Sequence, residues 1–473
     1  MGTINSAFYL ITGTLEADQS ALDIVANNVA NANTPGYTRE VPNWRERAPV
    51  EISGISYGTG VSQTGPTSVR DRVLEERLSQ QQQAASGSSA RLTALDSIQA
   101  LFTPASGSSS AVAGDIGSDI TGFFNSFASL EANATDASLR SEVLATARTL
   151  AGDISNTAAS LSSQKTALDQ QAASITSQVN SLTTAIAQLN LEIEGSSPNS
   201  DAGSLEDERQ LDLSKLSQLI GINQIRTDNN GISVTTAAGE MLVSEGTSYS
   251  LSKGAVGGET HFFLGGADIT AGLTLGDGEL GGLLTARDQD IPQVLAALDE
   301  LAFGLTTQVN ALNNAGSDLN GNTGTAATPL YMFAQPTAVA GSAAAMRVVM
   351  MDPSQIAAAT AAQGVGDNGN ARALAALGNT KIVAGLTPSG FYANFVTALG
   401  ATVAQVKITN KAQNASVAQL ETVRNSLSSV NLNDEAAFMQ QFERSYQAAS
   451  QIFAILNRIM ASVINLGVQT TVS

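Results

Sequence analysis

The chain of 473 residues contains no cysteine and one histidine, His261. Without cysteine there are no disulfides and no thiol nucleophiles, and one histidine is too few for a zinc site of Cys and His ligands. A Ser-His-Asp triad would have to use His261, which lies in a strand-like run at 260–264 with no nucleophile elbow near it. The sequence therefore predicts a protein that is not an enzyme and that has no catalytic, cofactor or metal site.

Positive charge is also scarce. Lysine and arginine total 23 against 42 acidic residues, which gives a formal charge of −19 and argues against nucleic acid or an anionic membrane as a partner. No basic residue precedes Arg39, so the cationic start of a secretory signal peptide is missing. No apolar run approaches the roughly 20 residues needed to cross a bilayer. We expect a soluble chain that uses another route if it leaves the cell.

What the sequence does contain is an apolar stripe at each end. Spacings of three and four place such residues on one side of a helix and suit a coiled-coil seam. The N-terminal stripe consists of Ile4, Phe8, Ile11, Leu15, Leu22, Val25 and Val29. The C-terminal stripe consists of Met439, Phe442, Tyr446, Ala449, Phe453, Leu456, Met460 and Val463. We expect the two terminal helices to pair with each other.

The C-terminal helix carries a second apolar row on an adjacent face. Its members are Ile452, Ile455, Ile459 and Leu466. A helix that is apolar on two sides needs two partners, and the N-terminal helix can supply only one of them. A neighbouring copy of the chain is the natural second partner, so the row predicts self-assembly. The alternative is an ordinary core helix.

Between the ends, the fold class is predicted to be mainly α with a small inserted β unit. Apolar residues at helical spacing indicate one long, coiled-coil-like helix from about residue 139 to 193, and period-two patterns indicate strands from residue 222 onward. We expect three divisions. These are an inner unit of 1–34 with 438–473, a long-helix domain of 35–315 with 373–437 whose β subdomain spans about 222–285, and a small or reduced outer insertion at 316–372.

Two short motifs look like ligand sites without meeting their structural requirements. Gly276–Gly281 matches G-x-G-x-x-G, but no alternating strand–helix series surrounds it, so a dinucleotide site is not expected. Residues 318–329 have the Asp and Asn spacing of a calcium loop, but their glycine comes one place late and Pro329 occupies the position of the bidentate glutamate. We interpret the first motif as a turn into a helix that begins near Asp288, and the second as an ordinary loop.

The most specific motif follows the first helix, in residues 20–39. Repeated asparagines weaken the helix there, and Pro35-Gly36 fits the centre of a type II turn. The motif's distinctive residues are Asn27, Asn28, Asn31, Pro35, Gly36 and Tyr37. This segment closely resembles the N-terminal signature of bacterial flagellar rod, hook and junction proteins. Residues 205–216, 278–287 and 430–435 are similar to the hook–filament junction members of that axial family.

The resemblance implies a structural role. Members of that family form a ring between hook and filament, with their paired terminal helices innermost, and the filament attaches to this ring. The implied partners are other copies of the chain, the hook protein, the second junction protein and an export chaperone that binds the C-terminal region. The implied location is the flagellum outside the cell, reached by flagellar type III export.

Two alternatives stay open on the sequence. One is another axial protein, either the second junction protein or a hook subunit. The other is a secreted adhesin or hydrolase with flagellar-type ends. The single histidine argues against a hydrolase, whereas binding by residues 316–372 is compatible with the sequence.

Overall fold

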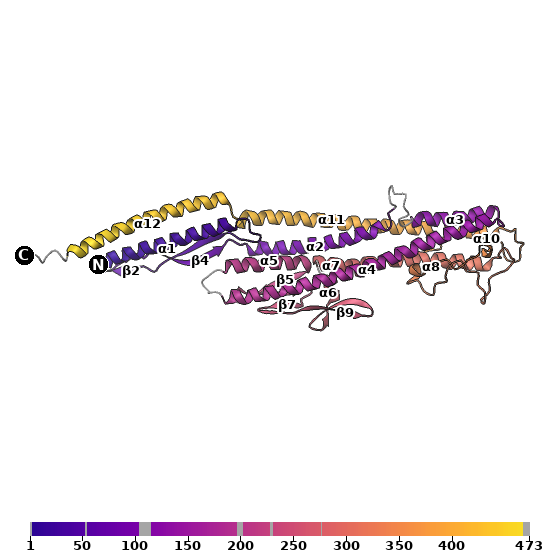
Figure 1. The fold of residues 1–473 in the computed structure, drawn as a ribbon, viewed down its shortest axis with the longest axis horizontal. Helices are drawn as coiled ribbons and strands as arrows, with labels where there is room; N and C mark the ends of the chain where they lie inside the picture. Colours follow the sequence, from indigo (N-terminus) through magenta and orange to yellow (C-terminus); the bar gives the residue numbers. More distant parts are fainter. Residues whose placement is uncertain are drawn as a thin grey trace, which may run out of the picture.

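The computed structural model of the protein describes residues 2–52, 54–103, 115–195, 202–227, 230–275 and 277–466. They form an elongated rod of helices that run along its length, and the first and last helices, α1 (Gly2–Asn31) and α12 (Leu432–Leu466), lie side by side at one end (Figure 1). The expected pairing of the two terminal helices is confirmed. The remaining long helices are α2 (Arg72–Ala100), α3 (Ile116–Ala132), α4 (Ala137–Glu194), α5 (Gly203–Leu219), α8 (Ile291–Ala315) and α11 (Pro388–Ser428).

The rod is built around α4, a single helix of 58 residues, as its apolar periodicity predicts. Asp136 caps its start by accepting hydrogen bonds from the backbone of Ser138 and Leu139 at 2.7 and 3.1 Å. The one break in the stripe, Lys165, forms an ion pair with Glu259 of β10 at 2.6 Å. The charged residue in the stripe therefore meets the β unit and not the helical core.

A second continuous helix begins earlier than expected. It starts with α7 (Gly278–Thr285), passes through a π-helical turn (Ala286–Asp290) and continues as α8, with Pro292 in the first turn of α8. The sequence-based start near Asp288 is therefore wrong, because the glycines that suggested a loop allow close helix packing instead. A Cβ on Gly282 would lie 2.0 Å from the carbonyl oxygen of Gly87 on α2.

The β unit consists of two small antiparallel sheets beside α4, within the range that the sequence predicts. The first contains β5 (Ile222–Arg226), β6 (Ile232–Thr236), β7 (Met241–Ser244) and β8 (Thr247–Ser248) in sequential order. The second contains β9 (Leu251–Val256), β10 (Glu259–Leu264) and β11 (Ala267–Asp268), with β10 in the middle, and α6 (Thr270–Thr274) follows. Asn190 of α4 holds the first sheet by donating to the carbonyls of Ile232 and Glu245 at 2.8 Å.

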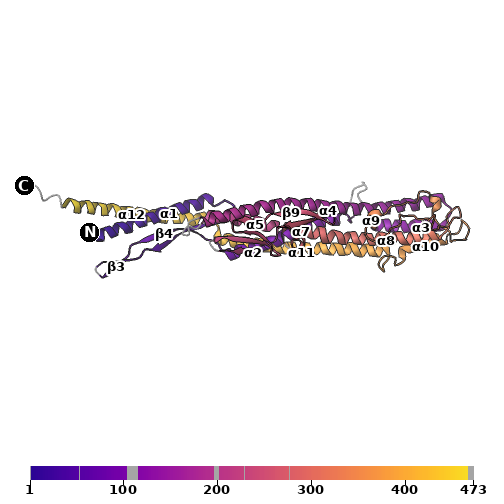
Figure 2. The same cartoon turned by 90° about the horizontal axis from the view of Figure 1, so that it is seen from below.

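A β ribbon between α1 and α2 lies along the terminal helices (Figure 2). It is built from β1 (Glu40–Glu46), β2 (Val50–Ile52), β3 (Ile55–Tyr57) and β4 (Val61–Ser68), with β1 paired to β4 and β2 to β3. The indole of Trp44 on β1 packs edge-on against Phe442 of α12, with ring centroids 5.8 Å apart. The ribbon therefore packs with the terminal helices, whereas the predicted domain boundary after residue 34 assigns it to the long-helix domain.

Residues 316–372 close the opposite end of the rod without a sheet of their own. They include only the short α9 (Ser342–Ala345) and a 3-10 turn (Pro353–Gln355), and they lead into α10 (Gly369–Ala376) and a second 3-10 turn (Leu377–Asn379). Phe333 and Ile356 are fully buried in the core that α3 and α4 also share. The almost fully buried Arg140 of α4 donates to the carbonyl of Ile356 at 2.7 Å. The segment is thus a compact cap on the bundle.

Candidate assembly site

The contact between α1 and α12 is built from aromatic and small apolar side chains. Phe8 and Phe453 meet edge-on with ring centroids 5.5 Å apart. Farther along, Ala21, Val25 and Phe442 form a buried cluster with Leu22 against it. The mixture of aromatic and alanine positions lets the two helices approach closely while large rings fill the space at each end of the contact.

Most of the predicted N-terminal stripe lies at this contact or beside the ribbon. Ile11 and Val25 are buried, and the half-buried members are Ile4, Phe8, Leu15 and Leu22. Val29 is 40% exposed, so its side chain is not buried between the two helices of the single chain. The preceding residue, Asn28, turns inward and is 1% exposed, and neighbouring residues on a helix point about 100° apart.

The C-terminal stripe is covered only in part. Phe442 and Ala449 are buried, and Phe453, Leu456 and Met460 are half-buried. Three members of the predicted seam are exposed, namely Met439 at 37%, Tyr446 at 36% and Val463 at 46%. These three are therefore not buried within the single chain, because α1 and the ribbon together cover a narrower strip of α12 than heptad spacing implies.

The second row of α12 has no cover within the described residues. Ile452, Ile455 and Ile459 are 46%, 54% and 45% exposed. The side chain of Leu466 lies outside the described residues. An unbroken row of half-exposed isoleucines on one helix is unlike the scattered apolar residues of an ordinary surface.

A buried polar cluster joins the terminal helices to the rod. The Asn28 side chain donates to the backbone carbonyl of Glu40 at 2.8 Å and to the carboxylate of Glu435 at 3.1 Å. Its amide oxygen accepts from the Glu40 backbone N–H at 2.9 Å and from the Tyr37 hydroxyl at 2.8 Å. All four hydrogen-bonding positions of the amide side chain are thus used, which explains why asparagine stands at this position.

Glu435 is the charged centre of this cluster and is fully buried. Arg39 donates to it at 2.6 Å, and the Arg39 guanidinium also lies 5.3 Å above the ring of Phe438. Burial first, and then nearby carboxylates, raise the pKa of Tyr37 well above its ordinary value, so its hydroxyl keeps its proton and donates. The cluster therefore holds the end of α1 to the start of α12.

The turn in the motif connects this cluster to α5. The Tyr37 backbone N–H donates to the Thr34 carbonyl at 3.2 Å and Gly36 has φ of +83°, as a type II turn centred on Pro35-Gly36 requires. Thr38 then donates its backbone N–H to Asp207 of α5 at 2.8 Å. Asn27 and Asn31 brace the last turn of α1, since Asn31 donates to the Asn27 side-chain and backbone oxygens at 2.8 and 3.1 Å.

Sequence reasoning missed several residues that the joint needs. Glu435 and Arg39 lie inside segments that carry the family resemblance, but their pairing across nearly the whole chain has no local signal. Asp207, Ser428 and Trp44 are also absent from the predicted set, although the Ser428 carbonyl accepts from the Arg39 backbone at 2.9 Å.

The other candidate motifs have structural roles. His261 is a strand residue of β10, and its Nδ1 lies 2.7 Å from the Asp268 carboxylate. Asp318 accepts from the backbone of Asn320 and Asn322 at 2.8 and 2.7 Å, as in a tight polar loop. Within the described ranges, no group of three or more acidic or histidine side chains is arranged to hold a metal ion. Nor does any described helix combine the length and hydropathy of a membrane crossing.

Comparison with known proteins gives consistent matches along the chain. The sequence model of the "Flagellar hook-associated protein FlgK helical domain" family matches residues 107–327, and that of the "Flagella basal body rod protein" family matches residues 8–38. Flagellar hook-associated protein 1 of Escherichia coli is 25% identical over 548 residues, covering 96% of this chain and 98% of its own length. The protein of that name from Bacillus subtilis is 25% identical, covering 95% and 96%.

The fold has a solved counterpart. The flagellar hook junction protein FlgK from Burkholderia pseudomallei superposes with a TM-score of 0.64 at 20% identity, covering 75% of this chain and all of the other. Paired terminal helices joined to a helical rod through an Asn-rich turn define an axial protein of the bacterial flagellum. Along almost its whole length, the chain is similar to hook-associated FlgK proteins, which form a structural family and not a family of enzymes.

Proposed function

We propose that this chain is a structural subunit of the junction between flagellar hook and filament, where copies form a ring through α1 and α12 and the filament attaches to that ring. The similarity to hook-associated FlgK proteins supports the place in the flagellum. The observation that carries the assembly proposal is the exposed row of Ile452, Ile455 and Ile459 on α12.

The row offers a useful amount of binding energy. Full burial of an isoleucine side chain contributes about 1.5–3 kcal/mol, so covering the exposed half of each would contribute about 1 kcal/mol. Three such residues would contribute about 3 kcal/mol per contact, before the cost of association. Repeated around a closed ring, a contact of this size favours assembly while leaving the single subunit soluble.

We also propose a division of the chain that follows its contacts. The inner unit comprises residues 2–68 with 432–466, because the ribbon packs on α1 and Trp44 packs on Phe442. This unit is larger than the predicted 1–34 with 438–473, since it includes the ribbon. The rod and its cap then form the outer part, and the cluster around Glu435 is the connection between the two.

The partners follow from this placement. The relatives' names associate them with the flagellar hook, and we propose the hook protein and the second junction protein as the axial neighbours of the ring. We further propose export through the flagellar type III channel, aided by a chaperone bound to the C-terminal region. The match of residues 107–327 to the FlgK helical domain speaks against a hook subunit or the second junction protein itself.

The test changes the isoleucine row in cells that carry no other copy of the gene. We expect a chain with Ile452→Ser, Ile455→Ser and Ile459→Ser to leave hooks in place while flagellin is released into the medium, because the ring lacks its apolar contact. Truncation of residues 439–473 should give the same result while the rod stays folded. The matched control is Ile408→Ser, since Ile408 is 65% exposed on α11, outside the terminal pair.

Electron microscopy and immunoblots of the medium provide the measurement. Normal filaments on cells with the triple variant would contradict the assembly proposal. Loss of filaments with Ile408→Ser as well would show that removal of an exposed isoleucine outside the terminal pair has the same effect, which would also contradict the assignment to the row.

A further inference from the structure

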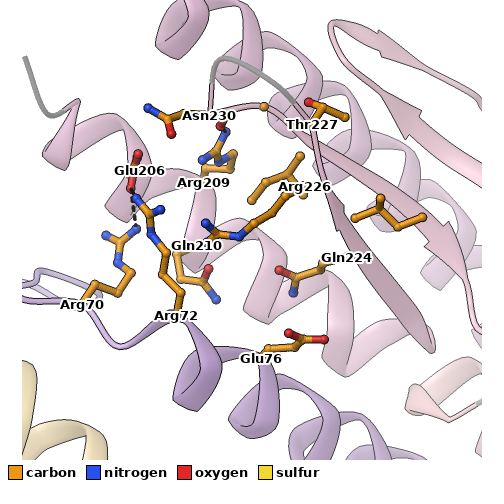
Figure 3. Close-up of a pocket in the computed structure, with 13 residues that line it drawn as sticks. Arg70, Arg72, Glu76, Glu206, Arg209, Gln210, Gln224, Arg226, Thr227 and Asn230 are labelled. Atoms are coloured by element: carbon orange, nitrogen blue, oxygen red, sulfur yellow. Dashed lines mark hydrogen bonds and ion pairs between the residues drawn. The ribbon is translucent and has the colours of Figure 1, made fainter. Parts of the chain in front are cut away.

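An arginine-lined cavity of about 400 Å³ lies between the start of α2, α5 and β5 (Figure 3). Its basic residues are Arg70, Arg72, Arg209 and Arg226. The close-up shows their side chains entering the same space from different elements. The chain as a whole is negatively charged, with 23 basic and 42 acidic residues. The four arginines make this cavity an exception, because basic residues outnumber acidic ones in its lining.

The acidic residues around the cavity neutralise only part of this charge. Arg70 and Arg72 share the buried carboxylate of Glu206, at 3.3 and 3.2 Å, and Arg70 also pairs with Asp207. The remaining acidic lining residue is Glu76, which is exposed at the rim. Two of the four guanidinium groups are left without an ion pair in the described part of the chain.

Arg209 is the more deeply placed of these two, at 5% exposed. It donates to the amide oxygen of Asn190 at 2.9 Å and to the backbone carbonyl of Asn230 at 2.7 Å, and both acceptors are neutral. Arg226 at the end of β5 is exposed, and its guanidinium makes no ion pair or hydrogen bond within the described ranges. Both therefore have donors available to an incoming ligand.

The electrostatics of the cavity favour an anion. Burial lowers the pKa of Arg209 to about 10; Glu206 opposes this shift, and repulsion from Arg70, Arg72 and Arg226 adds to it. The pKa of Arg226 is also lowered, by burial and then by Arg72, while Glu206 and Glu76 act in the opposite direction. The Nε of Arg70 is also buried with no acceptor among the described residues. Guanidinium groups crowded in this way gain charge-assisted hydrogen bonds, and lose mutual repulsion, when an oxyanion binds.

We propose that this cavity is a binding site for an oxyanion, a carboxylate or a phosphate, held by Arg72, Arg209 and Arg226. Because the chain itself is strongly acidic, a carboxylate side chain of a neighbouring copy is one source, and this source rests on the proposed self-assembly. A free anion in solution is the other. Arg70 of the cavity lining pairs with Asp207, and Asp207 also holds the Thr38 backbone at 2.8 Å, so the cavity lies next to the connection between the rod and the inner unit.

The first experiment measures binding of free anions to the full chain. Citrate and inorganic phosphate are titrated in a low-chloride buffer by calorimetry, with wild type, Arg226→Glu and Arg226→Ala. We expect saturable binding to wild type and a loss of about tenfold or more in both variants, because one charge-assisted contact is removed. The matched control is Arg77→Glu, on the same helix α2, exposed and outside the cavity lining.

Absence of saturable binding to wild type would overturn the proposal, as would an equal loss in the Arg77→Glu control. The Arg226→Ala variant guards against misfolding, since it removes the guanidinium without adding a carboxylate. A circular dichroism spectrum matching that of wild type verifies the fold of each variant.

The second experiment separates the two sources. A photoreactive benzoylphenylalanine replaces Gln224, which lines the cavity, in cells that make flagella. A crosslinked product of twice the subunit mass identifies a neighbouring copy as the source, and its absence beside intact filaments and intact citrate binding identifies a free anion. If the isoleucine triple variant makes normal filaments while citrate still binds, the assembly proposal fails and the oxyanion site stands.

Discussion

Removal of the Glu435 carboxylate should release α12 from the rest of the protein. Glu435 is 0% exposed and receives hydrogen bonds from Arg39 at 2.6 Å and from Asn28 at 3.1 Å. Each hydrogen bond to a charged group contributes about 1.5–3 kcal/mol, and a buried pair that loses one partner leaves the other charge unpaired. The Arg39 side chain is 23% exposed and regains some contact with water. We therefore expect Glu435→Ala to cost about 2–4 kcal/mol of local stability.

The loss should be local, because α12 contacts α1 and the ribbon while the rod has its own core. Hydrogen exchange resolved by mass spectrometry measures it directly. Exchange from α12 amides should rise about 30- to 700-fold, at 1.4 kcal/mol per factor of ten, while amides of α4 stay protected. Glu435→Gln should lose less local stability than Glu435→Ala, since glutamine keeps the shape of the side chain and one acceptor oxygen.

The matched control is Asp434→Ala, which removes an exposed carboxylate one residue away that has no ion pair among the described residues. Its α12 amides should exchange within about twofold of wild type, as surface substitutions usually shift stability by less than about 0.5 kcal/mol. Equal exchange in Glu435→Ala and Asp434→Ala would refute the role assigned to the buried cluster. A parallel rise in α4 would refute the separation of the terminal unit from the rod.

Three further outcomes are expected. Burial, and then the neighbouring Asp153, raise the pKa of Asp119 from 3.8 to about 7. The protonated side chain therefore contributes its full stability to the fold below pH 4, and this contribution is lost as the pH rises through 7. The Tm of Asp119→Asn relative to that of wild type should therefore rise between about pH 4 and 7, and a constant difference would contradict this. Gly282→Ala should lower the Tm by about 5 °C or more, because a core position facing the Gly87 carbonyl has no room for a methyl group; Gly152→Ala, with open space around it, is its control. Gly36→Ala should cost about 1–2 kcal/mol in chemical denaturation, since alanine is strained at φ of +83°, and Gly36→Asn should cost less.

The long helices were predictable because their signal is local and repeated. The stripe of α4 recurs over 58 residues, so one misplaced position such as Lys165 does not change the interpretation. The start of α7 was not predictable in the same way. Gly278 and Gly282 read as loop residues, yet they are in the helix because α2 approaches them through Gly87, and that approach is a property of the packed rod.

Some features of the candidate site were likewise predictable from the sequence, and others were not. The apolar stripes and the Pro35-Gly36 turn follow from residue spacing and from the backbone freedom of glycine, and both were visible in the sequence. The sequence did not show whether Val29 or Asn28 faces inward. These neighbours point in different directions, and the orientation of α1 about its own axis depends on the residues that pack against it. The partner is Glu435, separated from Asn28 by almost the whole chain.

The sequence by itself determined a helical protein with matching apolar ends, a turn after the first helix and a resemblance to flagellar axial proteins. Tertiary structure alone decided which face of α12 is covered by α1 and which isoleucines stay exposed. It also brought Arg72, Arg209 and Arg226 to one cavity. The physical reason is that periodicity specifies a helix and its apolar side, whereas long-range contacts between polar groups are set only when the helices pack and their buried donors and acceptors must pair.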